Sequence, residues 1–172
     1  MRTLLLLRHA KSSWDDSTLE DFDRPLAPRG EKAAPLMAAY LEKMGLRPDL
    51  VLCSPAARAR QTWSLVARSL GDKIAVNELR GLYLSPPGRL LEAVRRAPDA
   101  ATCVMLVGHN PGMEHLAMVL AGPSSNPTAL AKLHAKFPTA ALAEIEFDAA
   151  AWRDITYGAG CLTRFVRPKD LA

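Results

Sequence analysis

TLLLLRHA, at residues 3–10, is a short apolar run that ends in an arginine and a histidine. A strand that is apolar throughout is typical of a sheet that is covered on both faces. In open α/β sheets the carboxyl end of such a strand is the edge at which ligands bind. The segment therefore predicts a buried strand over residues 3–7, with Arg8 and His9 at the edge where a site can form.

The rest of the chain alternates between apolar runs and helical patterns. Apolar runs predict further strands at residues 50–53, 74–76 and 102–107. Apolar residues at helical spacing predict helices at residues 28–44, 57–70, 87–96 and 113–120. Strands that alternate with helices of this length predict a three-layer α/β fold, in which helices flank a mixed, mostly parallel sheet.

The last third of the chain has a different pattern. Residues 140–147 and 161–166 predict two late strands, which we expect to pair like a hairpin at the sheet edge. Residues 122–128 are rich in proline, serine and asparagine and predict a loop. Because no repeat or linker divides the sequence, we expect a single domain over residues 1–172.

Composition excludes several classes of protein. The chain has 172 residues, 49% of them hydrophobic and 23% charged, which is typical of a soluble globular domain. Its first apolar run is too short for a signal peptide or a bilayer span, so we expect a cytoplasmic protein with no membrane partner. The three cysteines are far apart and form no C-x-x-C, which argues against a disulfide framework or a zinc site. The basic residues behind the net charge of +4 are scattered, so we expect no nucleic-acid partner.

A second strand end carries an arginine. The sequence CSPAARARQT, at residues 53–62, joins the second strand to its helix. Ser54 is a natural N-cap and Pro55 suits the first turn, and the positive end of a helix favours anions. Arg58 and Arg60 are two residues apart and therefore point to different sides of the helix. We expect Arg58 to face a pocket at the strand end and Arg60 to face solvent.

A third strand end carries another histidine. The sequence VGHNPGME, at residues 107–114, places His109 just past its strand, as His9 follows the first, and Asn110 can cap the helix or donate to an anion. The sequence DRPLAPRG, at residues 23–30, precedes the first long helix, and from it Arg24 could reach the same edge. Fixed positive charges beside a nitrogen nucleophile suit attack on a phosphoryl group.

These four segments together resemble the histidine phosphatase superfamily, which has a phosphoglycerate mutase-like fold, and more narrowly its compact SixA-type phosphohistidine phosphatases. The match runs from Arg8 to about Glu114. The resemblance implies that His9 is the nucleophile and that a phosphate pocket surrounds it. Its members would be Arg8, Arg58 and His109, with Arg24 and Asn110 as further substrate-binding residues.

The sequence differs from the superfamily pattern after the histidine, and it has no clear match to the usual proton donor. Ala10 stands where the usual motif has glycine after the histidine, and a methyl group is tolerated there if the backbone φ is negative. The superfamily usually has an acidic proton donor after the strand that follows the Arg58 helix. Glu78, in Asn77-Glu78-Leu79-Arg80, is the nearest candidate for that donor.

The reaction that these residues suit is attack by His9, a phosphohistidine intermediate and its hydrolysis by water. Neighbouring arginines should lower the pKa of His9 and keep it neutral, and a hydrogen bond from one ring nitrogen to a backbone carbonyl would expose the other as nucleophile. We expect no cofactor and no metal, because the arginines take the place of magnesium.

The sequence predicts phosphohistidine on a signalling protein as the substrate, since the chain is short for a large lid and phosphohistidine needs no strong acid. A small-metabolite (sugar) phosphate phosphatase of the same superfamily and a catalytically silent phosphate-binding module are the alternatives. A cysteine phosphatase built on Cys53 is excluded, because its loop needs a cysteine, five intervening residues and then an arginine, and from Cys53 that count reaches Ala59.

Overall fold

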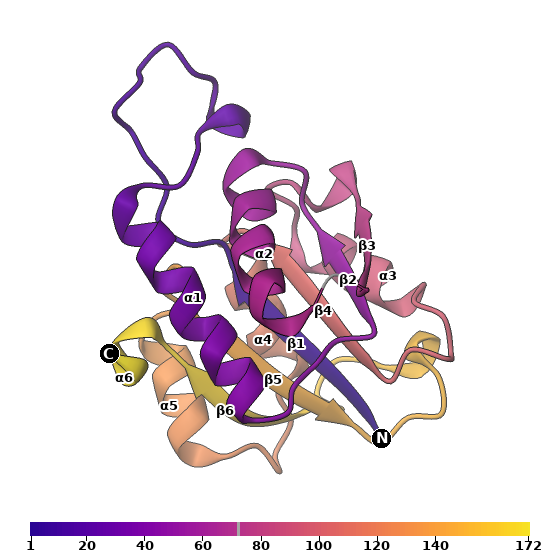
Figure 1. Cartoon of the computed structure of the whole chain (residues 1–172). Helices are drawn as coiled ribbons and strands as arrows, with labels where there is room; N and C mark the ends of the chain where they lie inside the picture. Colours follow the sequence, from indigo (N-terminus) through magenta and orange to yellow (C-terminus); the bar gives the residue numbers. More distant parts are fainter. Residues whose placement is uncertain (72) are drawn as a thin grey trace.

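A single six-stranded mixed sheet forms the centre of the protein (Figure 1). It is seen in a computed structural model that describes residues 1–71 and 73–172. The strand order is β3-β2-β4-β1-β5-β6. The strands β3, β2, β4 and β1 pair in parallel, and β5 and β6 are antiparallel additions. Their bounds are β1 (Arg2–Arg8), β2 (Leu50–Cys53), β3 (Ala75–Glu78), β4 (Cys103–Gly108), β5 (Leu142–Phe147) and β6 (Cys161–Val166). The predicted α/β class is confirmed.

Helices cover both faces of this sheet. Helices α1 and α2 pack against each other on one face, and α3, α4 and α5 lie on the other (Figure 1). The α-helices are α1 (Pro28–Lys43), α2 (Ala57–Leu70), α3 (Pro87–Arg95), α4 (Gly112–Leu120), α5 (Pro127–Ala135) and α6 (Pro168–Leu171). Short 3-10 turns are η1 (Asp21–Asp23), η2 (Arg80–Leu82) and η3 (Trp152–Asp154). Among the described residues, no helix has both the length and the apolar character needed to cross a membrane.

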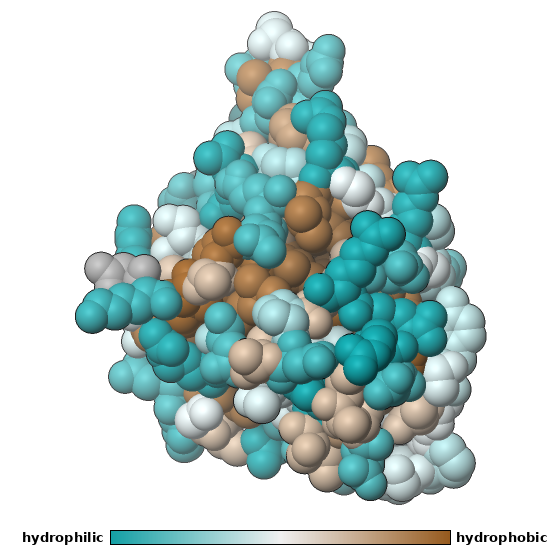
Figure 2. Space-filling model, turned by 90° about the vertical axis from the view of Figure 1, so that its right-hand side faces the viewer, coloured by the Kyte–Doolittle hydropathy of each residue, from teal (hydrophilic) through white to brown (hydrophobic). Residues whose placement is uncertain are grey.

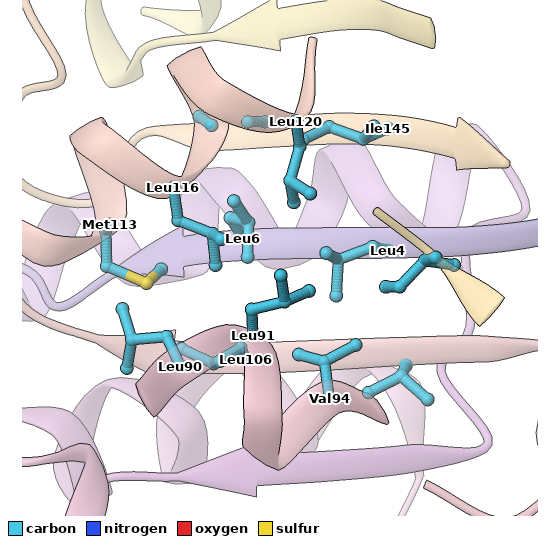
Figure 3. Close-up of a cluster of buried hydrophobic side chains, with 14 of the residues drawn as sticks. Leu4, Leu6, Leu90, Leu91, Val94, Leu106, Met113, Leu116, Leu120 and Ile145 are labelled. Atoms are coloured by element: carbon cyan, nitrogen blue, oxygen red, sulfur yellow. The ribbon is translucent and has the colours of Figure 1, made fainter. Parts of the chain in front are cut away.

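The leucines of β1 explain why this strand is central. Successive side chains of a strand point to opposite faces. Leu4 and Leu6 accordingly join the core under α3 and α4, whereas Leu5 and Leu7 join the core under α1 and α2, and all four are fully buried. Figure 3 shows the first of these cores, where Leu4 and Leu6 meet side chains of α3 and α4. An uninterrupted apolar run is thus required by burial on both faces.

The structure differs from the sequence-based prediction in the last third. The predicted loop at residues 122–128 ends early, because α5 begins at Pro127. Asn126 caps this helix by accepting a hydrogen bond from the backbone N–H of Ala129 at 3.0 Å. The late strands do pair antiparallel, but of these two only β6 is an edge strand, since β5 also pairs with β1. β5 begins at Leu142 and not at residue 140, because Ala140 has a φ of +62°.

Candidate active site

The parallel register of β1, β4 and β2 brings three strand ends to one point. Arg8 is paired with Gly108, so His9 and His109 leave the sheet side by side, with ring centroids 5.1 Å apart. The backbone N–H of His9 donates to the carbonyl of Gly108 at 3.0 Å, and that of Ser54 donates to the carbonyl of Val107 at 3.0 Å. A pocket of about 210 Å³ lies over these ends. Its lining includes all six predicted catalytic and substrate-binding residues, namely Arg8, His9, Arg24, Arg58, His109 and Asn110.

The ring of His9 is fixed by its own chain. Its Nδ1 lies 2.8 Å from the carbonyl oxygen of Ala10. Because a carbonyl only accepts hydrogen bonds, Nδ1 carries the proton and Nε2 keeps its lone pair. Nε2 lies 3.4 Å from the Nε of Arg58 at the pocket. His9 therefore has the orientation expected of a nitrogen nucleophile.

Ala10 is accommodated without strain in place of the usual glycine. Its methyl group is fully buried, and its backbone N–H donates to the Oγ1 of Thr62 at 2.9 Å. The non-glycine residues with positive φ in the described part of the chain are Leu84 and Ala140, so Ala10 has an ordinary backbone conformation. Ala10 thus meets the condition for tolerating a methyl group, which is a backbone φ that is not positive.

Arg58 is the most deeply buried cation of the pocket, with 3% of its surface exposed. Its guanidinium donates to the backbone carbonyl of Asp21 at 2.7 Å and to the Oδ2 of Asp21 at 3.0 Å. Arg60, two residues along the same helix, is exposed and pairs with Glu78 instead. The prediction that Arg58 faces the pocket and Arg60 faces solvent is confirmed.

Two buried donor-capable atoms of residues that line the pocket have no hydrogen-bond partner among the described residues. They are the Nε of Arg8 and the Nδ1 of His109. The Nη1 of Arg8 donates to the carbonyl of Phe137 at 3.0 Å, and the Nε2 of His109 lies 2.8 Å from the Oγ of Ser54. Because buried polar groups are normally paired, these two atoms point to a polar ligand. An anion in this pocket would satisfy them.

Ser54 has a different role from the expected one. Helix α2 begins at Ala57 with Ala56 as its N-cap, so Ser54 is not the cap, and its hydroxyl contacts His109. Asn110 precedes Pro111, the N-cap of α4, and its Oδ1 accepts from the N–H of Glu114 in the first turn at 3.2 Å. Its Nδ2 donates to the carbonyl of Phe137 at 2.9 Å. Asn110 therefore lines the pocket mainly as a residue that orders its wall.

Both pocket histidines are held neutral. Burial lowers the pKa of His9 to about 3, with further lowering by His109, Arg58 and Arg8, although the hydrogen bond to Ala10 acts in the opposite direction. Burial also lowers the pKa of His109 to about 3, with Arg58 as the next cause of lowering. The expected direction is confirmed for His9, but desolvation outweighs the arginines.

These pKa shifts predict a loss of stability in acid. The unfolded-state pKa of histidine is near 6.5, so between about pH 6.5 and 3 the unfolded chain binds more protons than the folded one. Stability from each histidine is complete above pH 6.5 and falls by about 1.4 kcal/mol per pH unit below it. Urea unfolding at several pH values should show this slope.

The variant His9→Gln should have a shallower dependence of stability on pH. The control variant His134→Gln, at the exposed surface of α5, should have the same dependence as the wild type. Identical slopes in all three proteins would contradict the lowered pKa of His9.

Asp21 and Tyr83 organise the pocket and were not predicted from the sequence. Asp21 lies in η1 and binds Arg58, Arg24 and the hydroxyl of Tyr83. Although burial alone would raise the pKa of Asp21, hydrogen bonds from Tyr83, Arg58 and Arg24 lower it to about 2. The ring of Tyr83 packs edge-on against His109 at 5.4 Å. Asp21 is therefore an ionised anchor for the arginines.

Arg24 reaches the pocket through its own set of contacts. Its Nη1 donates to the Oγ of Ser12 at 2.9 Å, and its guanidinium lies over the ring of Trp14, 3.5 Å from the centroid. Its Nη2 pairs with the Oδ1 of Asp21 at 3.0 Å. These contacts join the two sides of the loop that projects from the top of the molecule in Figure 1. Ser12, Trp14 and Arg24 of this loop line the pocket.

The structure does not bring Glu78, the candidate proton donor, to the pocket. Its Oε1 pairs with the Nε of Arg60 at 2.9 Å, at the exposed edge strand β3. It borders a larger, apolar cavity of about 550 Å³ whose wall includes Leu50, Leu52 and Leu82. Figure 2 views this side of the molecule, where an apolar hollow is bordered by hydrophilic side chains. The segment after β3 presents Leu84 to the catalytic pocket instead.

Within the described residues, no group of three or more histidine, cysteine, aspartate or glutamate side chains is arranged to hold a metal ion. The three cysteines are free thiols. Burial raises the pKa of the Cys53 thiol to about 12. Cys53 is thus a core residue at the end of β2.

Comparisons with known proteins agree with this geometry. Residues 4–83 match the family model of the histidine phosphatase superfamily (branch 1). An uncharacterised protein of Mycobacterium tuberculosis is 38% identical over 164 residues, which cover 95% of this chain and 100% of the relative. Two solved structures assigned the name phosphohistidine phosphatase SixA are also similar. The one from Agrobacterium tumefaciens is 31% identical with a TM-score of 0.82 and covers 97% of this chain and 98% of its own. The one from Nakamurella multipartitia is 29% identical with a TM-score of 0.85, and the match covers 97% of this chain and 96% of that one.

Proposed function

Because the chain belongs to the histidine phosphatase superfamily and is of its SixA type, we propose that it is a phosphatase that removes the phosphoryl group from phosphohistidine on a cytoplasmic signalling protein. The observation that carries this proposal is the state of His9. Its Nδ1 is bound to Ala10, its Nε2 faces a guanidinium, and burial keeps the ring neutral. We propose that the whole chain acts as one catalytic domain.

In the first step, the Nε2 of His9 attacks phosphorus while the bond from phosphorus to the substrate imidazole breaks. The phosphoryl group passes to His9, and the substrate imidazole leaves with its electron pair. Arg58 and Arg8 would neutralise the charge of the phosphoryl oxygens, and the neutral ring of His109 would donate a hydrogen bond to them. A water molecule then attacks the phosphorus of phosphorylated His9, releases phosphate and restores the neutral ring.

The side chains at the pocket rim favour phosphohistidine over a phosphate ester. An ester releases an alkoxide that needs a proton, whereas an imidazole leaving group can be protonated before it departs. Leu84 holds no proton, Asp21 is ionised, and Glu78 is engaged with Arg60. A substrate that supplies its own protonated leaving group is therefore the best match to these residues.

A substrate panel tests the proposal. The protein should release phosphate from a phosphohistidine-bearing protein with a kcat/KM well above that for sugar phosphates and a generic aryl phosphate. Treatment with EDTA should leave this rate unchanged. Turnover of a sugar phosphate with no action on the phosphoprotein would indicate a metabolite phosphatase. Phosphate binding with no turnover on any substrate would indicate a silent binding module.

A further inference from the structure

A second cavity adjoins the catalytic pocket. It has a volume of about 330 Å³ and shares two wall residues, Lys11 and Thr139, with that pocket. The two hollows therefore lie next to each other, with these residues in the wall of both. A protein substrate whose phosphoryl group lies at His9 is large enough to place neighbouring side chains in the second cavity.

The second cavity has a basic lining. Its charged wall residues are Lys11, Arg29, Lys136, Arg167 and Lys169. Arg167 is neutralised by Asp170, with an Nη2–Oδ1 distance of 2.8 Å. Within the described part of the chain, the other four form no ion pair. Four uncompensated cations around one hollow produce a positive potential that attracts anions.

The walls of this cavity are fixed to the catalytic residues. The carbonyl of Phe137, beside Lys136, accepts hydrogen bonds from the catalytic-pocket residues Arg8 and Asn110. The backbone of Lys11 is held against helix α1, where a Cβ on Gly30 would lie 2.2 Å from the Lys11 carbonyl. The N–H of Ala27 donates to that carbonyl at 2.9 Å. The backbone that carries Lys11 and Lys136 thus has a set position relative to His9.

We propose that this cavity binds acidic side chains of the phosphoprotein substrate and so selects phosphohistidines that have aspartate or glutamate nearby. The inference rests on the proposed function and gives its substrate a second recognition element. The apolar cavity at β3 makes no such contribution, because its wall shares no residue with the catalytic pocket. A carboxylate is the complement of these ammonium groups, and an adjacent phosphohistidine would reach His9 at the same time.

Neutralisation of two cavity residues outside the catalytic pocket tests this proposal. The double variant Lys136→Gln, Lys169→Gln should raise KM for an acidic phosphohistidine protein by about fivefold to tenfold, with kcat unchanged. Its rate on a small aryl phosphate should not change, because that substrate does not reach the cavity. Lys43→Gln, at the far end of α1, removes the same charge and should have no effect. The variant should also weaken the dependence of kcat/KM on salt.

A binding experiment separates this inference from the proposed function. A glutamate-rich peptide without phosphate should bind the wild-type protein at low salt, and a glutamine peptide of equal length should not. The double variant should bind the acidic peptide about fivefold more weakly, whether or not the protein turns over phosphohistidine. Equal peptide affinity in wild type and double variant would overturn the cavity assignment and leave the phosphatase proposal standing. If the peptide binds as expected but the phosphoprotein is not a substrate, the phosphatase proposal is wrong and the cavity assignment stands.

Discussion

Replacement of His9 by alanine is expected to abolish phosphate release on every substrate, with a loss of at least about 1,000-fold. Nε2 is the unprotonated nitrogen of this ring, and it faces the Nε–H of Arg58 in the pocket. An alanine cannot accept the phosphoryl group, and the arginines that remain can bind phosphate but not attack it. Inorganic phosphate should therefore still bind to the variant.

The covalent intermediate gives this prediction its most specific readout. Wild-type protein that is quenched during turnover of a labelled substrate should carry acid-labile, base-stable label, as phosphohistidine does. His9→Ala should carry none, whereas His134→Ala, at an exposed position of α5, should be labelled as the wild type is. Activity or labelling that survives in His9→Ala would show that another residue is the nucleophile.

Replacement of Arg58 by alanine is expected to lower kcat/KM by about 100-fold to 1,000-fold. Arg58 combines three properties: it is buried, it lies beside the nucleophile, and it is aimed by Asp21. A buried, pre-oriented cation stabilises developing charge far more than an exposed one, because it needs no reorganisation during the reaction. Arg58→Lys should recover little of the rate, because an ammonium group cannot bind Asp21 and two phosphoryl oxygens in the same plane.

Arg60→Ala is the matched control for this prediction, since it removes the same side chain from the same helix at an exposed site. Its kcat/KM should stay within about twofold of wild type. Unfolding in urea should confirm that both variants are folded. Full activity in Arg58→Lys would show that charge alone matters, and that the hydrogen bonds to Asp21 have no part in catalysis.

The sequence predicts the site residues that lie near the carboxyl ends of the parallel strands. Buried apolar strands can be identified from short-range pattern, and parallel pairing places their carboxyl ends together whatever the intervening helices do. His9 and His109 follow such strands directly, and Arg58 lies in the first turn of the helix after β2, so the fold class predicts that they converge. The choice of Arg58 over Arg60 needed only helical geometry.

Residues held by loops were not predictable in the same way. Asp21 and Tyr83 meet at the pocket because loop conformations place them there, and neither follows a strand end. Glu78 was assigned from an expected family position, but the chain turns through η2 before it reaches the pocket and presents Leu84 there. Helix α5 was missed because Pro127 and Asn126 look like loop residues, although together they form a helix start.

The position of β1 between β4 and β5 has a consequence for how the protein is made. The strand that ends beside His9 is synthesised first, yet both of its neighbours in the sheet belong to the second half of the sequence. Contacts so distant along the chain form slowly, because a long loop must close before they are gained. A ribosome-bound N-terminal half therefore has His9 and Arg58 but cannot assemble the pocket. We therefore expect phosphatase activity only after the C-terminal strands have emerged and completed the sheet.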